Sequence, residues 1–493
     1  MIDFIRRYRL SLVVFVVNLA VLGALLWLSL RQGGGLAYPL DDTYIHAVVA
    51  RNLVEHGSWG INPGEFASAS SAPGWVVLLA SGYALFGASS LLPGIFSVLA
   101  GGGALLVAEQ WMHRAKAPSW QRLIGLTAVS VLVPLPSMMG TGMEHTLQLL
   151  LVLLLARYAE ADGRRGLLVP LLLAAVLPMI RYESCLLIGW LGLSWMLQRR
   201  WRDGGLLWAV GAASVLLFGA WSVANGASGL PNGMLMKSMF PHRALENIQL
   251  NLREGAPVWL LALTVWGTAL RGSAHMRLFV LTAVSHLLLA RVGWFYRYEA
   301  YLMGWGALLL SLQLMAPGWR RRWLLGVGLV VASGGSRVVD ATRYFPGRSA
   351  YILDVKVRLA EALDAVAPDA RLALHDIGAM AWYTDVYIID VAGLGDDEVT
   401  RLSVSQRFTG ENIAALAERR GAQLGFAAEA WMSHDRLPGW QPVASFRWSP
   451  DHEHFVAHYI TYAVTAEGAD IGTRWMEEAA ARMDGRAVWE SLP

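Results

Sequence analysis

The feature that most constrains this chain is a predominantly apolar run from Leu10 to Leu30, which directly follows Arg6, Arg7 and Arg9. About 20 apolar residues are enough to cross a bilayer as one helix. The run is longer than the apolar core of a signal peptide and lacks its small-residue cleavage site, so we interpret it as a retained membrane anchor. The arginines before it predict a cytoplasmic N-terminus, because segments rich in Lys and Arg stay inside.

The composition extends this interpretation to most of the chain. Of 493 residues, 55% are apolar and only 16% are charged, which predicts an integral membrane protein. The formal net charge of +3 is small and its arginines lie in short loops, so it indicates membrane orientation and argues against nucleic-acid binding. Cys185 is the one cysteine, which excludes disulfides within the chain and zinc sites built from cysteines.

Further apolar segments lie at about 73–87, 91–108, 122–137, 144–157, 167–180, 185–197, 206–224, 257–270, 278–290, 300–315 and 322–335. Five of the connecting loops are rich in Arg and Lys, and we expect all five inside. They contain Arg114, Lys116 and Arg122; Arg157, Arg164 and Arg165; Arg199, Arg200 and Arg202; Arg271 and Arg277; and Arg320, Arg321 and Arg322. With the N-terminus also inside, all five loops fall on the inner side only if Ser71–Phe86 is a re-entrant or interfacial helix that does not cross the bilayer. This gives about eleven spans and an outer C-terminus.

The composition changes near Ser336 to a mixture of polar and apolar residues that continues to Pro493. A helical pattern at 350–366 is followed by apolar stretches at 371–375, 386–391, 423–426, 443–446 and 455–464, which are typical of strands. We therefore expect a polytopic α-helical membrane domain at 1–335 and a small soluble α/β domain at 336–493, on the outer side of the membrane.

The first outer loop, at 32–72, contains an acidic pair, Asp41 and Asp42. The residues after the pair have helical periodicity and predict a helix on the membrane surface, ending at Gly57 in a left-handed conformation. One of the two carboxylates suffices as a helix N-cap, which leaves the other as a candidate general base. Asp42 is nearer the helix and better placed to cap it, so Asp41 is the favoured base.

The outer loops also carry polar groups that a bilayer edge does not require, since ionisable groups at membrane depth are costly unless paired or functional. These candidate residues are His46 and Glu65 in the first loop, then Glu144, His145, Arg181, Tyr182, Glu183, Asn232, Lys237, Arg297 and Tyr298.

Several of these groups also have structural interpretations. The Arg181–Glu183 pattern is as typical of a structural ion pair near a helix end as of a functional site. Lys237 is as typical of a solvated lysine as of a phosphate contact. Glu144 and His145 are compatible with a metal site but more typical of a hydrogen-bonded core pair.

A resemblance emerges from the order of these motifs. Asp41-Asp42-Thr43-Tyr44-Ile45, Ala50-Arg51-Asn52-Leu53, Asn62-Pro63-Gly64-Glu65 and Ser70 to Trp75 resemble the first-loop signature of GT-C membrane glycosyltransferases. The similarity is greatest to the mycobacterial terminal arabinofuranosyltransferase group. Similar motifs follow in the order Gly142 to Thr146, Arg181-Tyr182-Glu183, Pro231-Asn232 with Lys237, Arg297-Tyr298, Asp376-Ile377-Gly378-Ala379, Asp390 and Gly393-Leu394.

The resemblance implies an enzyme of the inner membrane that transfers a sugar, with inversion, from a polyprenyl monophosphate donor to an acceptor hydroxyl at the periplasmic face. The sugar it implies is arabinofuranose, and the acceptor is a cell-surface glycan, a lipid or a protein such as a pilin. Asp41 or Asp42 would take the hydroxyl proton, while Lys237, Arg297 and Arg181 would hold the phosphate. No cofactor is expected, and a divalent cation is left open as an alternative.

Two other protein classes fit the composition. A transporter or flippase of lipid-linked sugar also contains intramembrane charge, although the charged loops here cluster on one face and no inverted repeat is present. A sensor or scaffold with an outer partner-binding domain is the second alternative.

The loop charges generate a first testable prediction. A topology reporter fused after Pro493 should report the periplasm, because an inside N-terminus and about eleven spans leave the C-terminus outside. A cytoplasmic signal from this fusion would contradict the orientation and would put Asp41 and Asp42 on the inner side. A reporter fused after Arg202, in a loop expected inside, provides the matched control.

Overall fold

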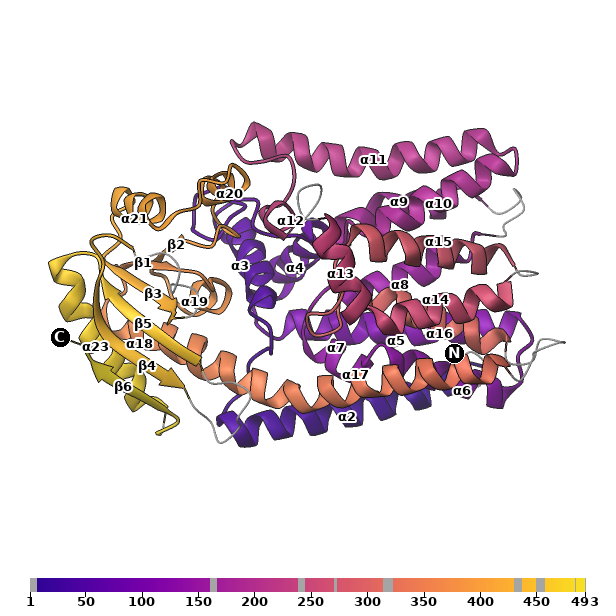
Figure 1. The fold of residues 1–493 in the computed structure, drawn as a ribbon, viewed down its shortest axis with the longest axis horizontal. Helices are drawn as coiled ribbons and strands as arrows, with labels where there is room; N and C mark the ends of the chain where they lie inside the picture. Colours follow the sequence, from indigo (N-terminus) through magenta and orange to yellow (C-terminus); the bar gives the residue numbers. More distant parts are fainter. Residues whose placement is uncertain are drawn as a thin grey trace. The chain divides into compact units, whose positions relative to one another are not determined.

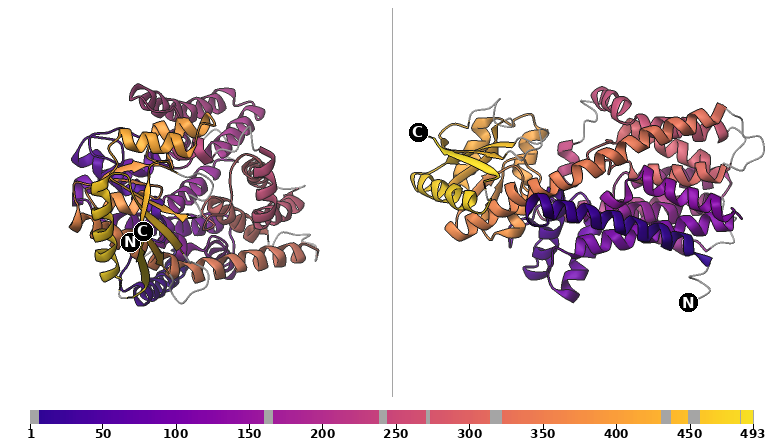
Figure 2. Two further views of the ribbon diagram at one scale, coloured as in Figure 1. Left: turned by 60° about the vertical axis from the view of Figure 1, so that its left-hand side comes forward. Right: turned by 90° about the horizontal axis from the view of Figure 1, so that it is seen from below.

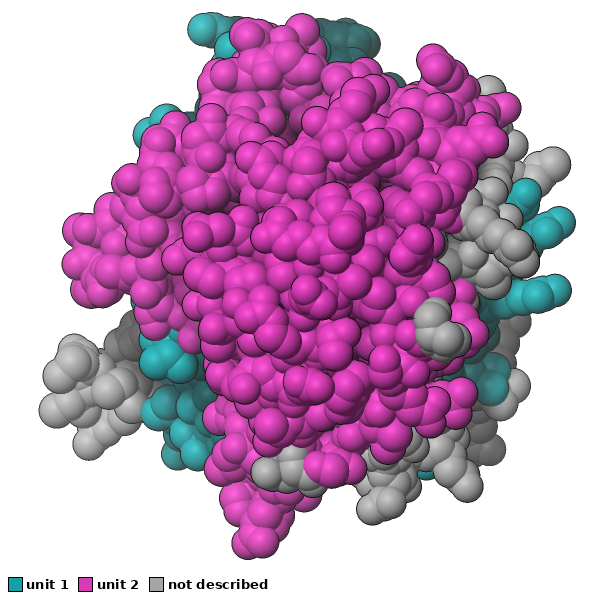
Figure 3. All heavy atoms as spheres, turned by 90° about the vertical axis from the view of Figure 1, so that its left-hand side faces the viewer, with its two compact units in different colours: residues 1–26, 91–218, 238–344 teal, residues 27–90, 219–237, 345–493 magenta. Residues whose placement is uncertain are grey.

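A computed structural model describes residues 7–159, 166–237, 244–269, 273–313, 322–429, 437–448, 457–483 and 485–492. The chain is mostly helical, with one six-stranded sheet formed by its C-terminal part (Figures 1 and 2). It divides into two compact units. Unit 1 comprises Met1–Leu26, Leu91–Phe218 and Ser238–Tyr344, and unit 2 comprises Trp27–Ser90, Gly219–Lys237 and Phe345–Pro493 (Figure 3).

Unit 1 is a helical assembly around one central helix, α16 (Ala300–Gln313). Every residue of α16 from Ala300 to Ser311 is buried, because this helix is apolar on all sides and packs against α6, α8 and α14. The other described helices that lie wholly within the unit are α5 (Leu92–Arg114), α6 (Ser119–Leu132), α7 (Leu135–Gly140), α8 (His145–Ala156), α9 (Leu168–Ile180), α10 (Ser184–Leu197), α13 (Ala244–Glu254), α14 (Ala256–Ala269) and α15 (Ala274–Leu289).

Three described helices are long and apolar enough to cross a membrane: α2 (Arg9–Gly33), α5 and α11 (Trp201–Ala224). Only 28% of the most apolar window of α2 and 22% of that of α11 are buried, so both present apolar faces suited to lipid. The predicted eleven spans are not confirmed, because seven other apolar helices have only 10–17 residues. At 1.5 Å per residue, a helix of about 14 residues covers about 21 Å of a hydrocarbon core about 30 Å thick.

Unit 2 contains the predicted first-loop helix, α3 (Asp41–Glu55), which packs against α4 (Pro73–Phe86). Gly57 follows α3 with a φ of +64°, as predicted for a left-handed stop. Helix α4 coincides with the predicted interfacial segment, and its place in a membrane stays a prediction. The remaining helices of the unit are α12 (Asn232–Lys237), α18 (Leu359–Val366), α19 (Gly378–Tyr383), α20 (Asp397–Val404), α21 (Gly410–Arg419) and α23 (Ala466–Ala481).

The sheet of unit 2 has the strand order β2-β1-β3-β5-β4-β6. Its strands are β1 (Arg371–Leu374), β2 (Tyr387–Asp390), β3 (Leu424–Ala428), β4 (Gln441–Trp448), β5 (Ala457–Ala463) and β6 (Ala487–Ser491). Strand β1 pairs in parallel with β2 and β3, whereas the pairs β3–β5, β5–β4 and β4–β6 are antiparallel. The five strands predicted from apolar stretches are therefore confirmed, and β6 is an additional strand.

The sheet is preceded by a nearly continuous helical segment. Helix α17 (Arg322–Ile352) continues through a π-helical turn, η1 (Leu353–Arg358), into α18. The predicted helix at 350–366 is thus present, with a π turn inside it. The composition change at Ser336 falls within α17, and the compact units divide this helix near Tyr344. The composition therefore changes a few residues before the boundary between the two compact units.

Candidate functional site

Asp41 lies at the start of α3, and its carboxylate binds the start of a different helix. Its two oxygens accept hydrogen bonds from the backbone N–H groups of Gly378, at 2.7 Å, and Ala379, at 2.8 Å. The N-cap residue of α3 is Leu40, which forms no side-chain cap, and both aspartates lie within the first helical turn. The expected division of the pair into one cap for α3 and one base is therefore not what the contacts show, because Asp41 serves the first turn of α19.

Arg51, ten positions further along α3, binds the other end of α19. Its guanidinium donates to the backbone carbonyls of Ala381, at 2.9 Å, and Trp382, at 3.0 Å, and lies 5.1 Å from the centre of the Trp382 ring. An anion therefore meets the N-terminus of α19 and a cation its C-terminus, which is the favourable arrangement of charge for a helix dipole.

A buried lysine lies beside the same loop. Lys356, on the π-helical turn η1, is 1% exposed, and its Nζ lies 2.9 Å from Oδ2 of Asp376 and 3.3 Å from the hydroxyl of Tyr459. The ammonium also lies over the Tyr459 ring, 4.6 Å from its centre. A buried ammonium is tolerated only with such partners, so Lys356 and Asp376 form one ion-paired element next to Asp41.

The charges of this cluster set its pKa values. Burial and the nearby charge of Asp376 raise the pKa of Asp41 to about 6, against the ammonium of Lys356 and the two N–H donors. Burial acts to raise the pKa of Asp376 as well, but Lys356 outweighs it and lowers that pKa to about 2, while the charge of Asp42 opposes the shift. The cluster therefore holds two carboxylates whose pKa values are driven apart, an arrangement typical of acid–base sites.

The other candidate residues of the first loop have structural partners in unit 2. His46 is buried and its Nδ1 lies 2.8 Å from the hydroxyl of Ser70. Glu65 accepts a hydrogen bond of 2.7 Å from the Tyr387 hydroxyl. Asn232, at the start of α12, is fully buried, and its backbone N–H donates to the Ser68 carbonyl at 2.9 Å.

Asp390, at the end of β2, shapes the loop after that strand. Its carboxylate accepts from the backbone N–H groups of Ala392 at 2.8 Å, Gly393 at 3.0 Å and Gly395 at 2.5 Å. Burial raises the pKa of Asp390 to about 7 in spite of these donors. Its contacts account for an aspartate at this point of the sequence through the local backbone.

Unit 1 brings together candidates from three other loops. Arg181, between α9 and α10, donates from Nη1 to Glu144 at 3.2 Å, and from Nε and Nη2 to Glu183 at 3.1 and 2.5 Å. The structural interpretation of the Arg181–Glu183 pattern is thus confirmed, and Glu144 joins the pair from the start of α8. Two carboxylates offset the single guanidinium, so Arg181 contributes little net positive charge.

Tyr298 connects this ion pair to a second arginine. The Arg181 and Arg297 guanidinium carbons lie 5.2 and 5.1 Å from the centre of the Tyr298 ring. Arg297 is 2% exposed and its Nη2 donates to the Tyr298 hydroxyl at 3.2 Å. Two cations on one aromatic ring are favourable through cation–π attraction. The ring of fully buried His145 lies 6.2 Å from the ring of Tyr298, and half-buried Tyr182 follows Arg181 in the chain.

The candidates thus form two groups, each within one unit. Asp41, Asp42, His46, Glu65 and Asn232 belong to unit 2, whereas the arginine–glutamate–tyrosine cluster, with His145, belongs to unit 1. The side chain of Lys237 lies outside the described residues. Within the described part of the chain, no three His, Cys, Asp or Glu side chains gather as a metal site would require, Glu144 and His145 included.

Sequence reasoning missed Lys356 and named Asp376 only as part of a motif, without a role in the site. Lys356 carries no local signal, because a lysine on an amphipathic helix is usually solvated. The signal for Asp376 is its position, directly after a buried strand and directly before the Ile-Gly-Ala sequence whose amides bind Asp41.

Comparisons with known proteins identify a fold. Residues 350–467 match the model of a domain of unknown function (DUF8728). A crystal structure of ArnT from Cupriavidus metallidurans bound to undecaprenyl phosphate is similar, with a TM-score of 0.50, 13% sequence identity, and coverage of 92% of this chain and 98% of ArnT. The apo structure of the same protein has a TM-score of 0.49 and 12% identity, with the same coverage. No curated protein matches the chain.

The chain therefore has an ArnT-like fold. The narrower resemblance to mycobacterial arabinofuranosyltransferases is not supported by these comparisons. At 13% identity the likeness describes the fold, and the functional assignment has to come from the residues.

The contact of α3 with α19 generates a second prediction. Gly378→Ala should lower the thermal unfolding temperature, because the new Cβ would overlap the backbone carbonyl of Asp41 and lie 2.9 Å from its Oδ2. A loss of stability of about 1–3 kcal/mol is expected from the displaced hydrogen bonds. Thermal unfolding in detergent measures it.

The matched control is Gly335→Ala in α17, where an added Cβ meets nothing within 4 Å. This variant should be neutral or slightly stabilising. Equal unfolding temperatures for Gly378→Ala and Gly335→Ala would contradict the tight contact between α3 and α19.

Proposed function

We propose that this protein is a GT-C glycosyltransferase, which transfers a sugar from a polyprenyl monophosphate donor to an acceptor hydroxyl. The observation that carries the proposal is the fixed carboxylate of Asp41, held by two backbone N–H groups beside the Lys356–Asp376 pair. The ArnT-like fold supports it, since ArnT was crystallised with undecaprenyl phosphate. The motif order of the sequence supports the same class.

Asp41 has the properties of a general base. Each of its oxygens accepts one N–H and keeps a second lone pair for a substrate hydroxyl. With a pKa of about 6 it is ionised at neutral pH and more basic than an ordinary aspartate. A base that is already fixed in place loses little entropy when the substrate arrives.

The proposed reaction is a direct displacement. The acceptor oxygen attacks the anomeric carbon, its proton passes to the Asp41 carboxylate, and the bond from that carbon to the phosphate oxygen breaks with its electron pair on the phosphate. Attack opposite the leaving group inverts the anomeric centre. Asp42 would orient the acceptor next to this base, in keeping with its position one residue along α3.

The departing phosphate gains negative charge and requires fixed cations. We assign this role to Arg297 and Lys237, because the guanidinium of Arg181 is offset by Glu144 and Glu183. Arg181 would then act mainly by fixing the Tyr298 ring that Arg297 also contacts. Glu144, Glu183, Tyr182 and His145 complete this cluster, and Glu65, His46 and Asn232 steady the first loop.

The remaining assignments follow the sequence. Arabinofuranose is the first sugar to test, since the first-loop motifs favour it. The acceptor is a cell-surface glycan, lipid or protein. The transmembrane domain at 1–335 would lie in the inner membrane, with the acidic pair and the domain at 336–493 in the periplasm.

The third prediction tests the chemistry. Purified protein should consume a radiolabelled polyprenyl-phosphate sugar and label an acceptor, and Asp41→Asn should lower turnover by about 10²–10⁴-fold at saturating donor. The new amide would also face the N–H of Gly378 or Ala379, so a loss of about 1–3 kcal/mol of stability should accompany it. Asp42→Asn should lose turnover to a smaller extent.

Glu55→Gln is the matched control, because Glu55 is an exposed carboxylate at the far end of the same helix. It should retain full turnover. If Asp42→Asn loses more turnover than Asp41→Asn, the base is Asp42, and normal turnover in both variants would exclude this loop from the chemistry. Transfer of unchanged donor across the membrane of vesicles that contain the protein would instead identify a flippase.

The fourth prediction concerns pH. If ionised Asp41 is the base, kcat/KM should fall about tenfold per pH unit below pH 6, where Asp41 becomes protonated. Asp376→Asn removes a charge that raises the pKa of Asp41, so the acidic limb should move to lower pH. Lys356→Gln removes a charge that lowers the pKa of Asp41, so the acidic limb of the pH profile should move to higher pH.

The opposite signs of these two shifts are the internal control, since a general loss of structure does not move the two limbs apart. Unfolding temperatures, measured beside the pH profiles, show the range in which each variant is folded. Two limbs that stay at the wild-type pH would contradict an Asp41 base coupled to this ion pair.

A further inference from the structure

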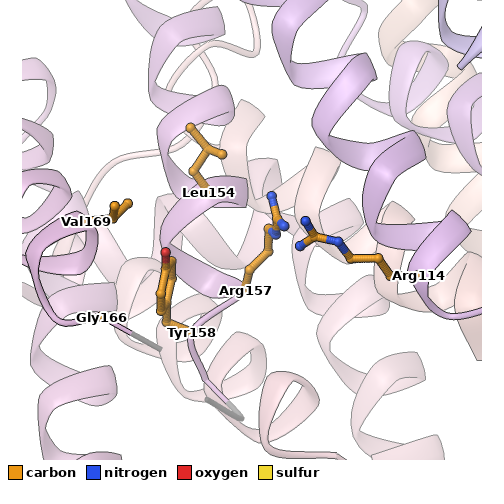
Figure 4. Close-up of a pocket in the computed structure, with 6 residues that line it drawn as sticks. All are labelled: Arg114, Leu154, Arg157, Tyr158, Gly166 and Val169. Atoms are coloured by element: carbon orange, nitrogen blue, oxygen red, sulfur yellow. The ribbon is translucent and has the colours of Figure 1, made fainter. Parts of the chain in front are cut away.

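A cavity of about 480 Å³ lies in unit 1 at the ends of three helices. It is found where α5 and α8 end and α9 begins (Figure 4). Its lining residues are Arg114, Leu154, Arg157, Tyr158, Gly166 and Val169. None of them belongs to the residues assigned to the transfer reaction.

Two arginines give this cavity its character. Arg114 is the last residue of α5 and Arg157 follows α8, and their guanidinium groups point toward one another (Figure 4). Neither forms an ion pair with any described residue. Like charges that face one another repel, so this arrangement is most stable with an anion between them.

Helix ends alone do not explain the arrangement. An arginine near a helix C-terminus is favourable when its guanidinium stays close to the last carbonyl groups. Here the two guanidinium groups face one another, and Tyr158 lines the same cavity (Figure 4). Two guanidinium groups are a donor set well suited to a phosphate.

The surface next to the cavity is apolar and exposed. Leu168, Val169, Leu172 and Val176 are 69%, 47%, 56% and 45% exposed, and their spacing places them along one side of α9. This stripe begins at the cavity, because Val169 also lines it. A phosphate in the cavity would therefore have an apolar surface beside it for an acyl chain.

We propose that this cavity binds the phosphate of an anionic membrane lipid, with Arg114 and Arg157 on the head group and an acyl chain along α9. Both arginines lie in loops that the sequence predicts to be cytoplasmic, where a membrane presents anionic head groups to basic pockets. This site is separate from the proposed donor-binding residues, and its ligand is a bound lipid and not a substrate.

The test measures retention of phosphatidylglycerol and phosphatidylcholine by the purified full-length protein with native mass spectrometry. The wild type should retain phosphatidylglycerol preferentially. The double variant Arg114→Gln/Arg157→Gln should bind it about 10- to 100-fold more weakly, because two charge-assisted contacts are lost. Arg202→Gln, at an exposed arginine in another loop predicted to be cytoplasmic, is the matched control and should bind as the wild type does.

Inorganic phosphate distinguishes the two sources of a phosphate group. Failure of millimolar phosphate to displace the lipid supports a lipid site, whereas phosphate binding without any lipid preference overturns it. Equal lipid retention by the wild type and the double variant also overturns the proposal. If the double variant does not fold, Arg114→Lys/Arg157→Lys keeps the charge, and its loss of bidentate contacts should still weaken binding.

Discussion

The geometry of unit 2 depends on how one long helix holds a short one. Helix α19 has six residues, too few to be stable in water by itself. Helix α3 binds it at both ends, with the Asp41 carboxylate on its first N–H groups and the Arg51 guanidinium on its last carbonyls. These contacts satisfy backbone groups that a helix leaves without partners and match the direction of its dipole. The acidic loop and α19 therefore fix each other.

A second contact extends this dependence to the sheet. Strand β2 is an edge strand, and the Asn62 side chain pairs with its free side, donating to the Ile388 carbonyl at 2.9 Å and accepting from the Ile388 N–H at 3.0 Å. One side-chain amide thus replaces a neighbouring strand and protects the edge. The first loop is folded against a domain more than 300 positions away in the sequence, so the carboxylate geometry requires the C-terminal domain.

The parts that the sequence predicted are those with a local cause. The helix that starts at Asp41 follows from periodicity and Gly57, and the five strands follow from short apolar stretches between polar ones. The partner of Asp41 is a backbone amide 337 positions away, which no local pattern contains. Lys356 was missed for the same reason, because its burial depends on Asp376 and Tyr459 from later segments. Apolar segments located the helices, but the count of spans rested on the Arg and Lys content of the connecting loops, and several of these helices are short.

The charge balance of the cluster also bears on the proposed reaction. Asp41 and Asp376 supply two carboxylates, Asp42 follows Asp41 in the chain, and the ammonium group of Lys356 lowers the pKa of both Asp41 and Asp376. Burial and the charge of Asp376 disfavour a further negative charge, which is why the pKa of Asp41 rises to about 6. When a donor bond to phosphate breaks, positive charge develops on the sugar ring, and a site with excess negative charge stabilises it more than the neutral ground state. The same imbalance that makes Asp41 basic would thus favour bond cleavage, while Lys356 keeps the cluster from protonating at neutral pH.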